Sequence, residues 1–284
     1  MSKEKIKSYW EINPPQIWYS NKKPLSNEWF NEIEYKRYKL YYDYLPTVAE
    51  FKDHAGEKVL EIGVGVGTDI LQYAKNKSKV YGIDLTRNAV GTTRLNLKRY
   101  GLNAENLQVA DAENLPFKDN TFDLVFSFGV LHHTPNTLKG INEIHRVLKP
   151  EGKAIVMLYS VGWKHIFKRI FINGILKGDI LRMGYQRTIN KNTEVKGNSP
   201  LTKVYLKGAV KRLFWGFGEV EISKYRLGEY FDYPPYRTRK LPKFVSNFMY
   251  FLTLEKLLGE NWIIKATKTP KKKKMSVLKT LVKP

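Results

Sequence analysis

The sequence has 284 residues, with 49 Lys and Arg against 27 Asp and Glu and no cysteine, which gives a formal net charge of +22. Without thiols the chain has no disulfide framework, no cysteine nucleophile and no cysteine-ligated zinc or iron–sulfur cluster. Its hydrophobic content of 42% is enough for a buried core. The sequence shows no signal-peptide pattern and no run of about 18 apolar residues, so we expect a globular cytoplasmic protein.

The positive charge is concentrated in the second part of the chain. Residues 1–160 hold 22 basic and 19 acidic side chains, whereas residues 161–284 hold 27 basic and 8 acidic ones. Residues 261–284 contribute eight of these lysines and no acid, and a lysine-rich end of this kind is typical of a flexible, solvated tail. The basic excess of residues 161–260 is therefore the part that can face an acceptor or a partner.

From residue 57 onward, short β-rich runs alternate with helical stretches. This rhythm is typical of a parallel sheet with helices on both faces. The expected strands cover residues 58–64, 79–85, 107–112, 122–128 and 153–159. The expected helices cover about 68–76, 86–99 and 136–148, the second with Thr86 as its N-cap. Together these elements predict the first five strands of an α/β domain.

The alternation of β-rich runs and helical stretches ends after residue 160. About sixty residues separate it from the next strand-like run at 219–226, which is too long for an ordinary connection and indicates an insertion. Inside this insertion the apolar residues between Trp163 and Ile175 recur at helical spacing.

The remaining elements are expected from local patterns. Residues 190–200 are polar and read as a loop, and Thr202 can cap a helix that runs to about Phe214. A helix-like stretch at 244–258 and a strand at 262–267 complete the pattern. The chain thus predicts two further strands after the insertion.

The strongest local signal is the glycine-rich stretch from Leu60 to Thr68 (LEIGVGVGT), directly after a buried strand and before a helix. Such a turn lets the backbone approach a nucleotide-like ligand at a helix N-terminus. Its G-x-G-x-G spacing differs from the G-x-G-x-x-G of dinucleotide-binding proteins. Taken alone, the stretch therefore also fits a purely structural tight turn.

Three further residues lie at expected strand ends and suit a nucleoside. Asp84 ends the second strand, where a carboxylate can accept both hydroxyls of an adenosine ribose, although a surface cap is the alternative. Asp111 follows the third strand and can accept a hydrogen bond from the exocyclic amine of adenine. The small Ala112 beside it leaves room for the ring plane.

The blocks EIGVGVG, GIDL, DAENLPF, LHHTP and RVLKPEG follow one another between residues 61 and 152. In this order and spacing they resemble the class I S-adenosylmethionine-dependent methyltransferases, in particular the methyltransferase type 11 subgroup related to ubiquinone/menaquinone and small-molecule methyltransferases. The resemblance is tight over residues 57–160 and loose over 218–268. One departure is Glu151, which replaces the first glycine of the family's usual KPGG.

The resemblance implies a Rossmann-like α/β fold, with a seven-stranded mixed sheet of order 3-2-1-4-5-7-6 and helices on both faces. It also implies S-adenosyl-L-methionine as the cofactor, with S-adenosyl-L-homocysteine as its product. Carried over residue by residue, the implied cofactor-binding set is Glu61, Gly63, Gly65, Gly67, Asp84, Leu85, Asp111, Ala112, Glu113, Phe128 and Gly129.

Methyl transfer from a sulfonium is an in-line displacement with a neutral leaving group, so alignment and exclusion of water are the main tasks of the enzyme. A base helps when the acceptor is a hydroxyl or a protonated amine, and an imidazole suits this role. His132 and His133 lie where the family places its acceptor site. We expect one of them in the pocket and the other packed or solvated. Either can act as the base, and the alternative is that they shape the loop and line the cofactor. No side-chain cluster indicates a metal site.

The resemblance divides the chain into an N-terminal helical and aromatic lid (1–50), a cofactor-binding core (51–160), a substrate-side insertion (161–218), the last two strands with a helix (219–268) and a basic tail (269–284). Substrate specificity in the family comes from the lid and the insertion. The expected substrate-binding residues are Tyr38, Tyr42, Trp163 and Phe167. Aromatic helices packed on a sheet would show the same pattern.

Three functions fit these observations. The first is methyl transfer to a small-molecule acceptor, anionic or lipid-linked, at an oxygen, nitrogen or carbon atom, with peripheral contact to an anionic membrane as an option. The second is RNA methylation through the basic second half of the chain. The third is a cofactor-binding module that binds a membrane or nucleic acid without turnover. We expect the small-molecule enzyme.

Overall fold

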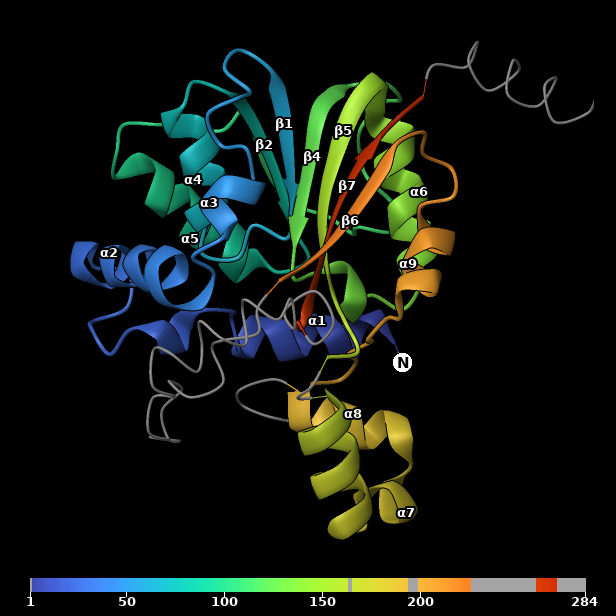
Figure 1. The fold of residues 1–284 in the computed structure, drawn as a ribbon. Coiled ribbons are helices and arrows are strands. Elements are labelled where there is room, and N and C mark those ends of the chain that lie inside the picture. The colour runs from blue at the N-terminus through green and yellow to red at the C-terminus, as the bar shows by residue number, and fades with distance from the viewer. Residues whose placement is uncertain (1, 163–164, 194–198, 226–258, 270–284) are drawn as a thin grey trace, which may run out of the picture.

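The computed structural model describes residues 2–162, 165–193, 199–225 and 259–269 (Figure 1). In these ranges one sheet contains seven strands, in the order β3-β2-β1-β4-β5-β7-β6. β7 runs antiparallel to β5 and β6, and the other neighbours are parallel. The predicted fold is thus confirmed. The strands are β1 (Lys58–Ile62), β2 (Lys79–Asp84), β3 (Asn106–Val109), β4 (Phe122–Phe128), β5 (Leu148–Tyr159), β6 (Val220–Tyr225) and β7 (Asn261–Thr267).

Helices cover both faces of the sheet (Figure 1), and 3-10 or π-helical segments are named η in the text. Those before the insertion are α1 (Lys3–Ile12), η1 (Ile17–Tyr19), α2 (Asn27–Lys36), η2 (Arg37–Tyr41), α3 (Leu45–Val48), α4 (Thr68–Lys75), α5 (Arg87–Lys98), η3 (Leu131–His133) and α6 (Thr137–Val147). Those within it are η4 (His165–Leu176), α7 (Asp179–Met183), α8 (Tyr185–Thr193) and α9 (Lys207–Leu213).

Two hydrophobic clusters hold the layers together, one on each face of the sheet. Successive side chains of a strand point to opposite faces, so Ile155 of β5 packs with α4 residues such as Tyr73, while Val156 packs with Ile144 of α6. All four of these side chains are buried. Burial on both faces explains why β4 and residues 154–159 of β5 are mostly apolar in the sequence.

Most expected elements of the core lie where the sequence places them, including Thr86, whose hydroxyl accepts a hydrogen bond from the Ala89 amide at 3.3 Å and caps α5. The prediction that Thr202 caps a helix is wrong. α9 begins at Lys207, directly after Leu206, whose backbone is extended, and Thr202 is buried beside His133. The loop expected from residue 190 is also wrong in part, since α8 continues to Thr193. The expected helix at 244–258 lies outside the described residues.

Helices from two separate segments, one before β1 and one after β5, lie on the side of the strands' carboxyl ends (Figure 1). α1 crosses that end of the sheet, and α7 and α8 extend beyond it, away from the sheet (Figure 1). Among the described residues, no helix has both the length and the apolar character needed to cross a membrane. The carboxyl ends of the strands and α1 thus face each other across the region where the predicted site residues lie.

Candidate active site

A cavity of about 1040 Å³, counted to its open mouth, lies between the carboxyl ends of the strands and α1. Open α/β sheets bind ligands at this edge, where the strand order reverses. Nine of the eleven expected cofactor residues line the cavity: Glu61, Gly63, Gly65, Asp84, Leu85, Asp111, Ala112, Phe128 and Gly129. Of the two expected catalytic histidines, His133 is on the lining and His132 is not.

The glycine-rich turn forms the floor of the cavity. Gly63 has a φ of +82°, and a Cβ added to it would lie 2.2 Å from a methyl carbon of Val130, so a side chain has no room there. Gly67 also has a positive φ, but its would-be Cβ meets Thr93 of α5 at 2.9 Å. Gly67 therefore lets two helices pack together and lies outside the cavity lining, which differs from its expected place at the cofactor.

Asp84 ends β2 and is fixed by hydrogen bonds to its carboxylate. The backbone N–H groups of Gly65 and Thr86 donate to it at 3.2 and 2.9 Å, and the Thr86 hydroxyl donates at 2.8 Å. Burial raises the pKa of Asp84, while the bonds from Thr86 and Gly65 favour the charged form. The carboxylate is thus held in place at the point where the sequence predicts a ribose.

The loop after β3 presents Asp111 and Ala112 to the cavity. One oxygen of Asp111 accepts from the Glu113 amide at 2.8 Å, and the other accepts from Lys3 of α1 at 2.5 Å. Glu113 is buried behind the lining, where it pairs with Lys3 at 2.8 Å and accepts from the Asn136 amide at 2.6 Å. Glu113 therefore braces the loop and does not reach the cavity.

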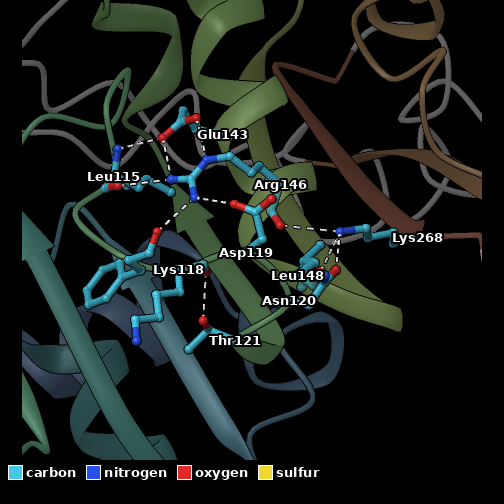
Figure 2. A network of polar contacts seen from close by, with 10 residues as sticks. Leu115, Lys118, Asp119, Asn120, Thr121, Glu143, Arg146, Leu148 and Lys268 are labelled. Carbon is cyan, nitrogen blue, oxygen red and sulfur yellow. Dashed lines mark hydrogen bonds and ion pairs between the residues drawn. The ribbon is translucent and has the colours of Figure 1, made fainter.

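Arg146 of α6 holds the next part of this loop (Figure 2). Its guanidinium donates to the carbonyl oxygens of Leu115 and Phe117 at 2.9 and 2.8 Å, and it pairs with Glu143 and Asp119 at 2.8 Å each. Glu143 in turn accepts from the Leu115 amide at 2.7 Å. The DAENLPF and RVLKPEG blocks are thus one structural unit, in which the second fixes the loop of the first.

The other end of the cavity contains buried acids and one buried base. Asp69 pairs with Arg37, whose Nε donates at 2.8 Å, and both side chains are about 4% exposed. Glu61 is buried, and one of its carboxylate oxygens has no hydrogen-bond partner. Burial raises the pKa of Glu61, and the nearby Asp69 acts in the same direction. An unpartnered buried carboxylate oxygen on a cavity wall is suited to a cationic ligand group.

The two histidines have different surroundings. His133 donates from Nδ1 to the carbonyl oxygen of Leu201 at 2.7 Å, since a carbonyl can only accept, so Nε2 is the basic nitrogen of the neutral ring. His132 is fully buried, stacks on Tyr159 with ring centroids 3.8 Å apart, and has no hydrogen-bond partner on either nitrogen. Burial keeps the pKa of His132 well below its usual range. His132 is thus a packing residue, and His133 is the histidine at the cavity.

Residues 199–205 form a strap that holds the loop of His133. The Lys203 amide donates to the His132 carbonyl at 2.9 Å, and its ammonium donates to the carbonyl oxygens of Thr134 and Pro135 at 2.9 and 2.7 Å. Burial lowers the pKa of Lys203. The insertion thus supplies both the carbonyl that orients the His133 ring and the cation that fixes the next two residues.

Several lining residues come from the N-terminal segment and carry no motif in the sequence: Lys3, Ile6, Trp10, Pro15, Gln16 and Arg37. Trp10 meets the His133 ring edge-on at 5.0 Å. The only local signal for this segment is the aromatic content that predicts a lid, which does not single out the charged residues among them.

The four expected substrate-binding aromatics are not brought together on the lining. Tyr38 donates its hydroxyl to Asp69 at 2.7 Å, and Tyr42 packs edge-on against Phe128 at 5.0 Å. Both rings lie behind the lining and support it. Trp163 lies outside the described residues, and Phe167 lies in η4 without a described side chain.

Within the described ranges, no group of three or more His, Asp or Glu side chains could hold a metal ion.

The sheet order, the glycine-rich floor and the carboxylate at the end of β2 define a Rossmann-like nucleotide-binding domain. Residues 60–156 match a family model described as "Methyltransferase domain". Over these residues the chain therefore resembles a class I S-adenosylmethionine-dependent methyltransferase domain.

Several named proteins are similar in sequence to this chain over part of their length. Phosphoethanolamine N-methyltransferase 2 of Caenorhabditis elegans is 31% identical over 51% of this chain and 34% of its own length. The ubiquinone/menaquinone biosynthesis C-methyltransferase of Citrifermentans bemidjiense is 32% identical over 40% and 50%. The chain spans less than two thirds of the length of such curated relatives.

A solved structure supports the fold. Phosphoethanolamine N-methyltransferase 2 of Haemonchus contortus, in complex with phosphomonomethylethanolamine and S-adenosylhomocysteine, superposes with a TM-score of 0.58 at 17% identity. The match covers 94% of this chain and 61% of that one. The region of likeness thus extends beyond residues 60–156 to most of the chain.

Proposed function

We propose that the protein is a methyltransferase that transfers a methyl group from S-adenosylmethionine to a small-molecule acceptor and releases S-adenosylhomocysteine. The observation that carries this proposal is the cavity, which combines the glycine-rich floor, the Asp84 carboxylate and the His133 ring on one lining. The relatives named for phosphoethanolamine and quinone methylation support a small-molecule acceptor.

The lining residues fit the proposed cofactor. The unpartnered oxygen of Glu61 can accept from the methionyl ammonium, and Gly63 leaves the backbone accessible because no side chain has room there. Asp84 can accept from the ribose hydroxyls, and Asp111 from the adenine amine beside the small Ala112. Phe128 and Gly129 line the remaining wall. Gly67, Glu113 and Leu85 complete the proposed set, the first two as supports.

When bound, the cofactor supplies a methyl group on a sulfonium, whose leaving group is a neutral thioether. The tasks left to the chain are to align the acceptor, exclude water and take up a proton. Nε2 of His133 can accept a proton from an acceptor hydroxyl or ammonium, because its Nδ1 hydrogen is engaged by Leu201. The fully buried His132 shapes this loop and takes no part in proton transfer.

The N-terminal segment and the insertion act as covers in this proposal. Trp10 and Lys3 bring α1 against His133 and Asp111, so α1 shields the cavity from water. Tyr38 and Tyr42 support this cover from behind by contacts to Asp69 and Phe128. Because Lys3 pairs with the Asp111 carboxylate that the proposal assigns to adenine, we expect this ion pair to open during turnover.

One labelling experiment tests the proposal. The protein is incubated with methyl-labelled S-adenosylmethionine and separate extracts of metabolites, lipids, RNA and protein. We expect label in the metabolite or lipid extract and none without the enzyme. Label found only in RNA would replace the small-molecule acceptor by a nucleic acid. Tight binding of S-adenosylhomocysteine with no labelled product in any extract would indicate a module without turnover.

A further inference from the structure

Three helical segments of the insertion, η4, α7 and α8, form a helical protrusion, which is defined here as residues 165–191. η4, α7 and α8 pack on one another. The protrusion extends beyond α1, at the end of the molecule where the strands end (Figure 1). It therefore contributes little to the main core and is placed to meet a partner on the side of the cavity.

Exposed apolar side chains are concentrated on this protrusion. Six of the sixteen large hydrophobic side chains exposed in the described residues lie between residues 166 and 185. Leu181 is 91% exposed, Leu176 67% and Ile175 60%. Exposure of single apolar residues is ordinary, but a concentration of them on one small element marks an interaction surface.

Polar side chains are buried within the protrusion and where it meets residues 199–205. The buried Asn173 donates to Asn192 at 3.0 Å, and the buried Asn190 donates to the Pro200 carbonyl at 2.9 Å. Leu181 is thus exposed while Asn173 is buried, and Ile189 is the buried large apolar side chain of α8. The exposed leucines therefore do not serve to fold the protrusion, and a contact with an apolar phase would account for their exposure.

The charge of the protrusion indicates which apolar phase this is. Residues 165–191 contain six Lys and Arg but a single acid. That acid, Asp179, is buried and pairs with Lys191 at 3.2 Å. Lys177 and Arg182 are exposed beside the leucines. Apolar side chains bordered by uncompensated basic residues are typical of helices that lie in the interface of an anionic bilayer.

We propose that the protrusion docks on the surface of an anionic phospholipid bilayer, with Leu176 and Leu181 inserted below the headgroups. A short chain of contacts joins this surface to the cavity. On α8, Gln186 donates to the Thr202 carbonyl at 2.8 Å, and Asn190 accepts from the Thr202 amide at 2.9 Å. Thr202 follows Leu201, the residue that orients His133. When the protrusion is docked, the cavity receives a lipid or lipid-linked acceptor from the bilayer. This part of the proposal rests on the proposed function.

Sedimentation with vesicles tests the docking without any acceptor. We compare vesicles of phosphatidylcholine with vesicles of equal parts phosphatidylcholine and phosphatidylglycerol. The wild type should bind the anionic vesicles at low salt, and the Leu176→Ser/Leu181→Ser variant should bind them roughly tenfold more weakly or worse, because two inserted side chains are lost. The matched control is Trp215→Ser, which removes a side chain that is 86% exposed on another part of the surface. It should bind like the wild type.

Each contrary result is informative. Equal binding of the wild type and the double variant overturns the proposal, as does loss of binding only on replacing Lys271 to Lys274 with Gln. Self-association that the double variant abolishes, without vesicle binding, would assign the surface to a second copy of the chain. Calorimetry with S-adenosylhomocysteine separates the two proposals. Failure of that binding alone contradicts the proposed function, and failure of vesicle binding alone contradicts the docking.

Discussion

Two regions meet at the cavity, and they hold their side chains by different means. The strand-edge loops are fixed by backbone hydrogen bonds of the sheet and its turns, such as the Gly63 amide bonded to the Ile83 carbonyl at 2.8 Å. The covering segments, α1 to η2 and residues 199–205, lie outside the sheet. They are held by apolar packing, as of Trp29 and Ile33, and by charged side chains such as Arg37 and Lys203. From this comparison we expect cofactor affinity to depend on side chains that the core holds in place, such as Asp84, and closure of the cavity to depend on the side chains that anchor the cover, such as Arg37.

The largest effect is expected at His133, where the two regions join. His133→Gln should lower the rate of methyl transfer to the accepting extract by about 10²- to 10⁴-fold, because a general base is lost. Its affinity for S-adenosylhomocysteine should change by less than about threefold, since the loop backbone stays in place. Rates come from incorporation of label and affinities from calorimetry.

The control for this prediction is His145→Gln, on a helical residue whose ring contacts Phe217 and lies outside the cavity lining. It should retain the wild-type rate. Equal losses for both variants, or an unchanged rate for His133→Gln, would remove the base assignment and leave alignment as the main contribution of the loop.

The second largest effect is expected for the cover itself. Arg37→Met should lower the free energy of unfolding by about 3–5 kcal/mol, because Asp69 would be left as a buried charge without its ion pair. The neighbouring Lys36→Met removes a partly exposed pair with Glu32 and should cost less than about 1 kcal/mol. Urea unfolding measures both. Similar losses for the two variants would show that the cover is not held by its buried pair.

The third prediction concerns the core side of the comparison. Asp84→Ala should weaken binding of S-adenosylhomocysteine by about 10- to 100-fold, since hydrogen bonds to a charged carboxylate contribute about 1.5–3 kcal/mol. Asp53→Ala, on an exposed acid outside the lining, is the control and should bind normally. Thermal unfolding monitors the structural cost of losing the bonds to Gly65 and Thr86. Unchanged affinity of Asp84→Ala would contradict the proposed ribose site.

The difference between the strand-edge loops and the covering segments also explains how much of the site can be predicted from the sequence. Gly63, Asp84 and Asp111 follow strands at fixed offsets, so their positions can be read from the motif and the fold together. Arg37 meets Asp69 across 32 residues, and Lys3 meets Asp111 across 108. No spacing along the chain encodes such pairs, because they depend on how α1 and η2 dock on a finished core.

Thr202 shows the same limit for local structure. A threonine ahead of a helical pattern is a good N-cap by its chemistry, but here its hydroxyl lies 3.2 Å from that of Ser199 and near the His133 ring. Tertiary contacts thus override the local preference. The two adjacent histidines illustrate the point further, since only the docked strap of residues 199–205 determines that His133 and not His132 faces the cavity.

The smallest predicted effect concerns pH and the loop behind the cavity. His132 stays neutral when folded, because burial and the nearby His133 and Lys203 depress its pKa, whereas in the unfolded chain it titrates near 6.5. As the pH falls below about 6.5, the unfolded state therefore binds a proton that the folded state does not. Stability should fall by up to about 1.4 kcal/mol per pH unit from this residue.

His132→Phe isolates this contribution, because a phenyl ring can keep the stacking on Tyr159 without titrating. Other groups shift in the opposite direction, among them Glu61 and His54, whose pKa values are raised, but they are the same in both proteins. Urea unfolding of both proteins at pH 7 and pH 5 measures the difference. If the variant loses as much stability as the wild type over this interval, His132 is protonated in the fold. The strap would then leave both histidines accessible to protons, and the distinction between a packing and a catalytic histidine would rest on orientation alone.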